Sequence, residues 1–230
     1  MAQPAFCGLF QHRYLDIFPH SLQHDRGPAP PVTVTRRPEM PSQASGDLPS
    51  WADTLGARPI VYVSLGTVPL FNQPPEFEPI LRGLSQHDVD VVATVGELND
   101  PAGFDVPGNV VVEQWLPLRT LLNRCAAVVC HGGSGTILSA FAAGLPMVVV
   151  PKGAAQFVNG RICSQPGAAR VLWPDQVTAT NVAAEGDWLL AADAATAAAA
   201  IAGEIAAMPS PDRVLSDLQV LTGSGARVVQ

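Results

Sequence analysis

The chain has little charge for its length. Asp, Glu, Lys and Arg make up 14% of its 230 residues and hydrophobic residues make up 47%, whereas charged residues are about a quarter of a typical soluble domain. Lys152 is the only lysine, and the net charge is −7. An acidic chain attracts neither nucleic acid nor an anionic membrane surface. We therefore expect a large buried core and neither of those partners.

Long apolar runs are also missing. No stretch approaches the roughly 20 apolar residues that a membrane span needs. Residues 1–10 lack the basic start and the long apolar core of a signal peptide. We therefore expect a cytoplasmic protein whose thiols are reduced.

The chain has few cysteines, and none is in a CxxC pair. Cys7, Cys125, Cys130 and Cys163 lie in apolar surroundings, which favours buried free thiols over a disulfide or a metal site. A zinc site of Cys125, Cys130 and His131 is the alternative, but its spacing is not that of known zinc sites. We expect no metal and no cofactor.

Prolines divide the chain. Six of them lie between Pro28 and Pro49, a density that predicts a linker or an extended segment with no packed helix or strand. Upstream, residues 14–18 form an apolar patch that is too short to make its own domain. After Trp51 the pattern becomes regular.

Strands and helices alternate in this regular part. Apolar runs predict strands at 60–65, 89–95, 110–112, 127–130, 147–150 and 171–172. Helices are predicted at 76–85, 118–124, 135–143, 157–165, most of 180–208, and 211–221. This alternation predicts an α/β fold with a single Rossmann-like, doubly wound parallel sheet covered by helices on both faces.

A glycine-rich loop joins one of these strands to a helix. Val128–Cys130 reads as the end of a buried strand, and the loop His-Gly-Gly-Ser-Gly-Thr follows at 131–136. Its glycines and the free N–H groups of the next helix suit a phosphate. A plain tight turn is the alternative. The loop lacks the lysine of a P-loop, which disfavours a nucleoside triphosphatase.

Three further loops lie where predicted strands end. They contain Gly66 and Thr67, Trp115 and Leu116, and residues 151–159. Because ligands of such sheets bind outside the carboxyl ends of the strands, we expect all four loops to converge on one site.

In this order, the four loops resemble the donor-binding half of a nucleotide-sugar glycosyltransferase of the GT-B type, in the bacterial branch that glycosylates macrolides and other natural products. The motifs that carry the resemblance are Val61–Thr67, Trp115–Pro117, His131–Thr136, Gly144–Pro146, Val149–Pro151 and Gln156–Asn159. It runs from about Tyr14 to Leu221.

The resemblance implies a role for each loop. The diphosphate of a TDP- or UDP-sugar would be held by His131, Gly133, Ser134, Gly135, Thr136, Gly66 and Thr67. Trp115 and Leu116 would hold the base, although a buried structural Trp is the alternative. Gln156 would hydrogen-bond the hydroxyls of the sugar, unless it is simply an exposed residue at a helix N-terminus.

Two positions depart from the family pattern. The family usually has an acidic residue before the glutamine, and this chain has Ala155, which cannot accept a hydrogen bond from a sugar hydroxyl. Either the donor is a deoxysugar or donor binding is impaired. Ser139 occupies the position where plant members carry an acidic residue for the ribose.

The resemblance also implies a division into domains. Residues 1–27 would be the end of an acceptor-binding domain, 28–50 an interdomain linker and 51–230 the donor-binding domain. The general base would lie in the acceptor domain, so we expect no catalytic residue in this chain; His12, His20 and His24 do not match its loop.

The function that follows is inverting, metal-independent transfer of a sugar to a small natural-product acceptor, with a separate acceptor domain as partner. One alternative is a nucleotide-binding module without activity, as in a truncated remnant. Another is half of a GT-B sugar-nucleotide epimerase. An exposed apolar face near Trp51, Leu70 or Phe71 is also expected, and it would favour self-association.

Overall fold

The computed structural model describes residues 14–23, 33–35 and 46–223. Its contacts divide the chain into two units, one of Met1–Pro38 with Gly203–Gln230 and one of Glu39–Ala202. The larger unit contains the main sheet and the candidate functional site.

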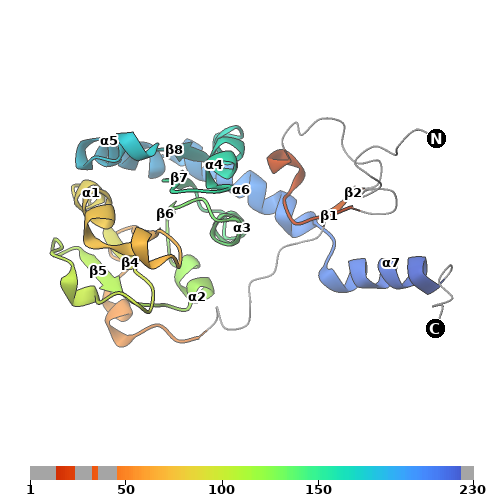
Figure 1. The fold of residues 1–230 in the computed structure, drawn as a ribbon, viewed down its shortest axis with the longest axis horizontal. Coiled ribbons are helices and arrows are strands. Elements are labelled where there is room, and N and C mark those ends of the chain that lie inside the picture. The colour runs from red at the N-terminus through yellow and green to blue at the C-terminus, as the bar shows by residue number, and fades with distance from the viewer. Residues whose placement is uncertain (1–13, 24–32, 36–45, 224–230) are drawn as a thin grey trace. The chain divides into compact units, whose positions relative to one another are not determined.

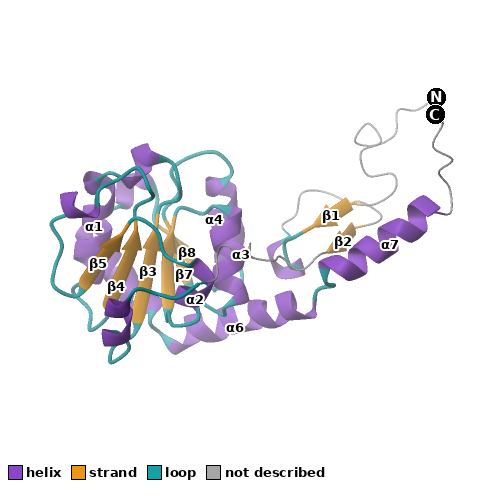
Figure 2. Cartoon of the chain, turned by 90° about the horizontal axis from the view of Figure 1, so that it is seen from below, coloured by secondary structure: helices purple, strands orange, loops and turns teal. Residues whose placement is uncertain are grey.

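The larger unit is built on a six-stranded parallel sheet (Figure 2). Its strands are β3 (Ile60–Ser64), β4 (Asp90–Thr94), β5 (Val110–Glu113), β6 (Ala127–Cys130), β7 (Met147–Val149) and β8 (Ala169–Val171). They pair in the order β5-β4-β3-β6-β7-β8, which is the order of a doubly wound nucleotide-binding fold. The predicted α/β class and parallel sheet are confirmed.

Helices cover both faces of this sheet (Figure 1). Those of the larger unit are α1 (Pro74–Leu84), α2 (Leu118–Leu122), α3 (Ser134–Ala142), α4 (Gln156–Ser164), α5 (Ala179–Leu189) and the first part of α6 (Ala192–Ala207). One face is covered by α1 and α5, which pack against each other, and the other by α2 and α3. α4 packs against the edge strand β8.

The central strands are buried along their whole length. Every residue of β3, β4 and β6 is buried, which explains why their sequences are continuous apolar runs without alternation. Phe77 and Ile80 of α1 pack into the core over one face, and Ile137 and Phe141 of α3 are fully buried.

Local signals set several helix boundaries. α1 begins at Pro74, which is favoured at the first helical position, and the Thr178 hydroxyl caps α5 by accepting from Asn181 N at 3.2 Å. The stretch 180–208, which we expected to be mostly helical, forms two helices, since α5 ends at Leu189 and α6 begins at Ala192.

One prediction about the proline-rich segment is wrong. We expected no strand between Pro28 and Pro49, but β2 (Thr33–Thr35) lies there and pairs in parallel with β1 (Tyr14–Asp16). Residues 32–37 contain no proline, and Thr-Val-Thr is β-branched and favours an extended backbone. The rest of this segment up to residue 45 lies outside the described residues.

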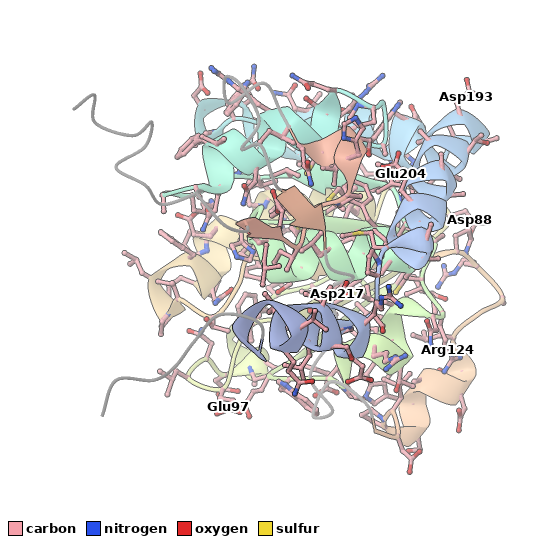
Figure 3. All side chains as sticks on the ribbon, turned by 90° about the vertical axis from the view of Figure 1, so that its right-hand side faces the viewer. Asp88, Glu97, Arg124, Asp193, Glu204 and Asp217 are labelled. Atoms are coloured by element: carbon pink, nitrogen blue, oxygen red, sulfur yellow. The ribbon has the colours of Figure 1, made fainter. Side chains whose placement is uncertain are left out.

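The smaller unit contains β1, β2 and α7 (Pro211–Gly223). In this unit, Ser21 N donates to Oε2 of Glu204, which lies on α6, at 3.1 Å. Asp217, labelled with Glu204 in Figure 3, lies on α7 and pairs with Arg213 one turn earlier.

The sheet order reverses between β3 and β6. The strands β4 and β5 lie on one side of β3, whereas β7 and β8 lie on the opposite side, beyond β6. The carboxyl ends of β3 and β6 therefore lie side by side at the point of reversal. Ligands bind at this point in such sheets.

No single described helix is long and apolar enough to span a membrane. One bent pair, Ala179–Leu189 with Ala192–Val220, passes the length and composition test only when its two helices are taken together across a 68° bend.

Candidate functional site

A cleft of about 350 Å³ opens at the carboxyl ends of the strands, at the end of the sheet to which the arrows point in Figure 2. Its lining comes from β3 and the end of β4, the loops that follow β3, β4, β5 and β6, and the starts of α2 and α3. The lining residues are Tyr62, Ser64, Gly66, Thr67, Thr94, Gly96, Gln114, Trp115, Leu116, Leu118, His131, Gly133, Gly135 and Thr136.

Most predicted phosphate-binding and base-binding residues therefore lie together. Of the predicted set, Gly66, Thr67, Trp115, Leu116, His131, Gly133, Gly135 and Thr136 line this cleft. Ser134 is next to it, as the first residue of α3. The lining joins three of the four loops that we expected to converge.

The imidazole of His131 is held between two glycines. A Cβ on Gly66 would lie 2.8 Å from Nε2, and a Cβ on Gly133 would lie 2.8 Å from Cε1. Both distances are below the closest approach of real Cβ atoms. Gly66 also has φ +90°, which side chains other than glycine rarely tolerate. The absence of a side chain at both glycines thus leaves room for the ring, which lines the cleft.

His131 has unused hydrogen-bonding capacity. Its Nδ1 is buried and has no hydrogen-bond partner among the described residues. Burial lowers the pKa of the imidazole below its usual 6.5, and the nearby Ser64 carbonyl oxygen raises it by a smaller amount. The ring is therefore neutral at pH 7 and holds one N–H, and an anion beside it would raise its pKa again.

The start of α3 points its free N–H groups at the same space. Gly133 is the N-cap, without a side-chain cap, and the first helical bond runs from Ile137 N to Gly133 O at 3.0 Å. The N–H groups of the first turn have no partner within the helix. The first turn has no acidic residue, so the positive end of the helix dipole is available to an anion.

Asn159 of α4 holds the loop at 131–136 by hydrogen bonds. Its Nδ2 donates to Gly132 O at 2.9 Å and to Ser134 Oγ at 3.3 Å, and the residue is 7% exposed. Gly132 has φ +88°, and a Cβ there would lie 2.9 Å from the Val149 side chain. The loop conformation is therefore determined by its neighbours and not only by its own sequence.

Trp115 and Leu116 have opposite environments. Trp115 is 55% exposed, whereas Leu116 is 4% exposed. The alternative of a buried structural tryptophan is thus wrong, and the indole is free to stack on a flat ligand. On the floor of the cleft, the Tyr62 hydroxyl and Thr94 Oγ1 are 2.6 Å apart, and burial raises the pKa of the Tyr62 phenol.

The family of the chain follows from its sequence match to a family model. The model of the Erythromycin biosynthesis protein CIII-like, C-terminal domain family matches residues 78–221. The chain belongs to this family.

Curated relatives agree with this assignment. Elloramycin glycosyltransferase ElmGT of Streptomyces olivaceus is 39% identical over 119 residues, which are 51% of this chain and 30% of the relative. Tylactone mycaminosyltransferase of Streptomyces fradiae is 29% identical over 187 residues, which are 80% of this chain and 41% of the relative.

Solved structures share the fold. The glycosyltransferase VinC in complex with DTDP matches with a TM-score of 0.78 at 27% identity, over 92% of this chain and 52% of that one. The rhamnosyltransferase SpnG complexed with thymidine diphosphate matches with a TM-score of 0.75 at 27% identity, over 89% and 56%. The chain thus spans about half the length of these structures and less than half of those curated relatives, and it is a glycosyltransferase C-terminal domain of the antibiotic-biosynthesis type.

In this glycosyltransferase domain, the loop after β7 lies outside the cleft lining. Gln156 Oε1 accepts from Lys152 N at 2.7 Å and from Gly153 N at 3.0 Å. Its oxygen is therefore used within the loop, and Nε2 is the end of the amide that remains for a ligand. Ala155 is exposed and immediately precedes α4.

The same loop is tied to α1. The ammonium group of Lys152, whose side chain is 10% exposed, forms an ion pair with Glu76 in the first turn of α1. Ala154 has φ +52°, a left-handed conformation that is uncommon for alanine. The loop therefore has a fixed, slightly strained shape.

Sequence reasoning missed several site residues. Tyr62, Thr94 and Asn159 were given no role, although the first two line the cleft and the third holds the phosphate loop. A hydroxyl-bearing side chain inside an otherwise apolar strand is the signal that would have indicated Tyr62, in the middle of β3, and Thr94, the last residue of β4.

Three of the four cysteines lie in the described part of the chain, and all three are free thiols. Cys130 and Cys163 are buried, and Cys125 is half-buried. Burial raises the pKa of Cys130 to about 11 and that of Cys125 to about 12, so both are protonated and unreactive at neutral pH. Cys7 lies outside the described residues. Within the described ranges, no group of three His, Cys, Asp or Glu side chains is arranged to hold a metal ion.

The expected exposed apolar face is present in part. Leu70 is 72% exposed, whereas Phe71 packs against the core and Trp51 is half-buried, with its Nε1 donating to Glu113 at 2.8 Å. Arg124, labelled in Figure 3, donates to Ala52 O at 2.8 Å and so fixes the turn that carries Trp51.

Proposed function

We propose that this chain binds the nucleoside diphosphate of a TDP- or UDP-sugar and serves as the donor half of an inverting, metal-independent glycosyltransferase. The observation that carries the proposal is the imidazole of His131, whose Nδ1 has no hydrogen-bond partner among the described residues and whose ring lies between two glycines at the uncapped start of α3. Three kinds of donor meet there: a ring N–H, the N–H groups of a helix N-terminus, and the hydroxyls of Ser134 and Thr136.

These donors suit a leaving diphosphate. As the bond between the sugar and the diphosphate breaks, negative charge grows on the oxygen that leaves. Prearranged N–H groups and a helix dipole stabilise that charge more strongly in the transition state than in the ground state. The residues of this chain would thus lower the barrier by binding the leaving group, without a metal ion.

The base of the nucleotide would lie against Trp115. The indole is exposed at the rim of the cleft, and its flat face offers stacking to a pyrimidine ring. Relatives of this chain have been solved with thymidine diphosphate, which favours TDP as the first nucleotide to test.

The sugar would lie near Gln156 and Ala155. Because Gln156 Oε1 is occupied by two backbone N–H groups, its amide can donate to a sugar oxygen but offers no acceptor. Ala155 offers none either. A sugar hydroxyl directed here would lose its partner at a cost of about 1–3 kcal/mol, so we propose a deoxysugar donor that lacks this hydroxyl.

The acceptor and the general base would be supplied by an acceptor domain. Deprotonation of the acceptor hydroxyl would accompany departure of the diphosphate. His131 does not suit this role, since its ring lies beneath the diphosphate position.

Calorimetric titration with TDP, UDP and pyrophosphate tests the binding step. Saturable TDP binding that is lost in His131→Ala supports the proposal. Transfer of sugar after mixing with an acceptor domain distinguishes a donor half from an inactive nucleotide-binding module, which would bind TDP but transfer nothing. An epimerase half would instead interconvert the free sugar nucleotide.

A further inference from the structure

Four side-chain amides hold the loops that form one rim of the cleft, and two of them, Gln73 and Gln114, hydrogen-bond across to a neighbouring loop. They are Asn72, Gln73, Asn99 and Gln114, and we call them the amide network. Asn72 and Gln73 follow β3, Asn99 follows β4 and Gln114 follows β5. They come from three separate loops and contain no charged group.

The first pair holds the loop after β3. Asn72 is fully buried, and its Nδ2 donates to Gly66 O at 2.9 Å and to Val68 O at 3.1 Å. Gln73 Nε2 donates to Pro69 O at 3.1 Å and, across to the next loop, to Asn99 Oδ1 at 2.8 Å. The position of Gly66, which contacts the His131 ring, thus depends on Asn72.

Asn99 is the centre of the network. It is 9% exposed, its Nδ2 donates to Val95 O at 2.8 Å, and its backbone oxygen accepts from Gln114 Nε2 at 3.0 Å. Gln114 Nε2 donates also to Glu97 O at 3.3 Å, and Gln114 O accepts from Gly96 N at 2.9 Å. The residue just before Trp115 is therefore fixed by side chain and backbone together.

Gln73 and Gln114 are exposed, yet each uses both N–H bonds of its amide. Holding a long side chain in one rotamer costs conformational entropy, and an exposed glutamine gains little stability in return because water offers the same hydrogen bonds. The fixed side chains of Gln73 and Gln114 are explained if they keep the loops in one conformation, since the rim of the cleft then binds a ligand without rearrangement.

We infer that the amide network is a positioning element that holds Gly66, Gly96 and Trp115 in the conformation that binds the nucleotide. Gln73 and Asn99 touch no ligand in this scheme and act through Gln114 and the loops. The inference rests on the proposed function for the identity of the ligand, but the preordering of the rim belongs to the ligand-free chain. An uncharged network also keeps this shape independent of pH.

Hydrogen exchange of the ligand-free chain tests the preordering. Gln73→Met and Gln114→Met keep the side-chain length and remove the amide. Gln86→Met is the matched control, because Gln86 lies in the turn after α1 and its side chain donates to Arg82 O, at 3.2 Å, and not to another loop. We expect peptides covering 66–72, 96–99 and 114–116 to exchange about tenfold faster in the two test variants, through local opening, with α3 peptides unchanged. Unchanged exchange in the rim, or an equal rise across the whole sheet, would overturn the inference.

Nucleotide affinity tests the consequence. Calorimetry should show a loss of about fivefold to tenfold in TDP affinity for Gln73→Met and for Gln114→Met, with the unfolding temperature kept and Gln86→Met unaffected. Because both act through Asn99, their combined loss should be smaller than the product of the two. Unchanged TDP affinity in both variants, or a multiplicative double variant, would contradict it. If the unsubstituted chain binds no TDP, the proposed function fails, and the exchange measurement alone decides this inference.

Discussion

The ring of His131 and the α-carbon of Gly66 are so close that a methyl group on Gly66 would lie 2.8 Å from Nε2. The two residues follow neighbouring strands, β3 and β6, at the point where the sheet order reverses. This contact between loops 65 residues apart in the chain places the imidazole under the cleft and leaves its Nδ1 without a protein partner.

Gly66→Ala should therefore displace the ring. The added methyl group clashes with the imidazole, and φ +90° is strained for alanine. We expect TDP affinity to fall at least about tenfold and stability to fall by about 1–3 kcal/mol. Gly103→Ala is the control, since nothing lies within 4 Å of a Cβ there and no left-handed φ is involved. Equal behaviour of the two variants in calorimetry and thermal unfolding would refute the packing argument.

The pH dependence of stability should include a contribution from His131. Burial lowers its pKa in the folded chain below the 6.5 of the unfolded chain, so the unfolded chain binds more protons between these values. The stabilisation is complete above pH 6.5 and is lost as the pH falls through 6.5 towards the folded pKa. Thermal unfolding between pH 5 and 8 should show a shallower pH dependence in His131→Asn than in the original chain. The same slope in both would contradict the assignment.

Ligand binding should reverse this trend. A diphosphate beside the ring favours imidazolium and raises the pKa of His131, so binding takes up a proton over the range between the free and bound pKa values. TDP affinity should then increase as the pH falls through that range. Calorimetry in buffers with different ionisation enthalpies measures the proton uptake directly, and no uptake in the original chain would argue against a contact between His131 and the diphosphate.

Trp115 should matter for the base alone. Trp115→Ala removes an exposed indole and should weaken TDP binding by about 1–3 kcal/mol while leaving pyrophosphate binding unchanged, as expected for a stacking interaction. Trp188→Ala serves as the comparison, because this indole contacts Arg170 with 4.7 Å between the guanidinium carbon and the ring centre and does not line the cleft. A loss of affinity for both ligands would point to collapse of the rim.

Asn159→Ala should affect both stability and binding. It removes two donated hydrogen bonds and leaves the carbonyl oxygen of Gly132 without that partner, at a cost of about 1–3 kcal/mol. The freed loop should also bind pyrophosphate more weakly. Asn181→Ala removes an amide that donates to Gln176 O at 2.8 Å on an exposed turn, and it should change neither property.

Donor choice should respond to position 155. Ala155→Asp would restore an acceptor beside Gln156, so the affinity for a TDP-sugar with all its hydroxyls should rise relative to a deoxysugar donor. Competition calorimetry with the two donors measures this ratio. An unchanged ratio would show that the hydroxyl is directed elsewhere.

The sequence predicted the sheet well because its strands are buried on both faces. Continuous apolar runs such as Val61–Val63 and Val128–Cys130 are typical of strands at the centre of a parallel sheet, and both runs are buried there. The strand β2 was not predicted, because the surrounding prolines outweighed the signal of three β-branched residues. Its pairing with the short strand β1 is evident only in the structure.

For the cleft, the motifs predicted three of the loops that converge, but the loop at 151–159 lies outside the lining, and the motifs did not predict how the loops are held. His131 and its glycines were identifiable from the loop sequence, whereas the contact of His131 with Gly66 depends on strand order. Asn99 and Gln73 had no signal at all, because their hydrogen bonds join loops that only the folded sheet brings together. The hydrogen bonds that Gln156 Oε1 accepts from Lys152 N and Gly153 N could not be predicted either, because they depend on a local turn in which Ala154 has φ +52°.

The most direct test of the account is calorimetric titration of the chain and of His131→Ala with TDP. The account predicts one saturable TDP site in the original chain, with the affinity reduced about tenfold or more in the variant while the unfolding temperature stays close to that of the original chain. TDP binding of equal strength in both proteins, or no binding to either, would contradict it.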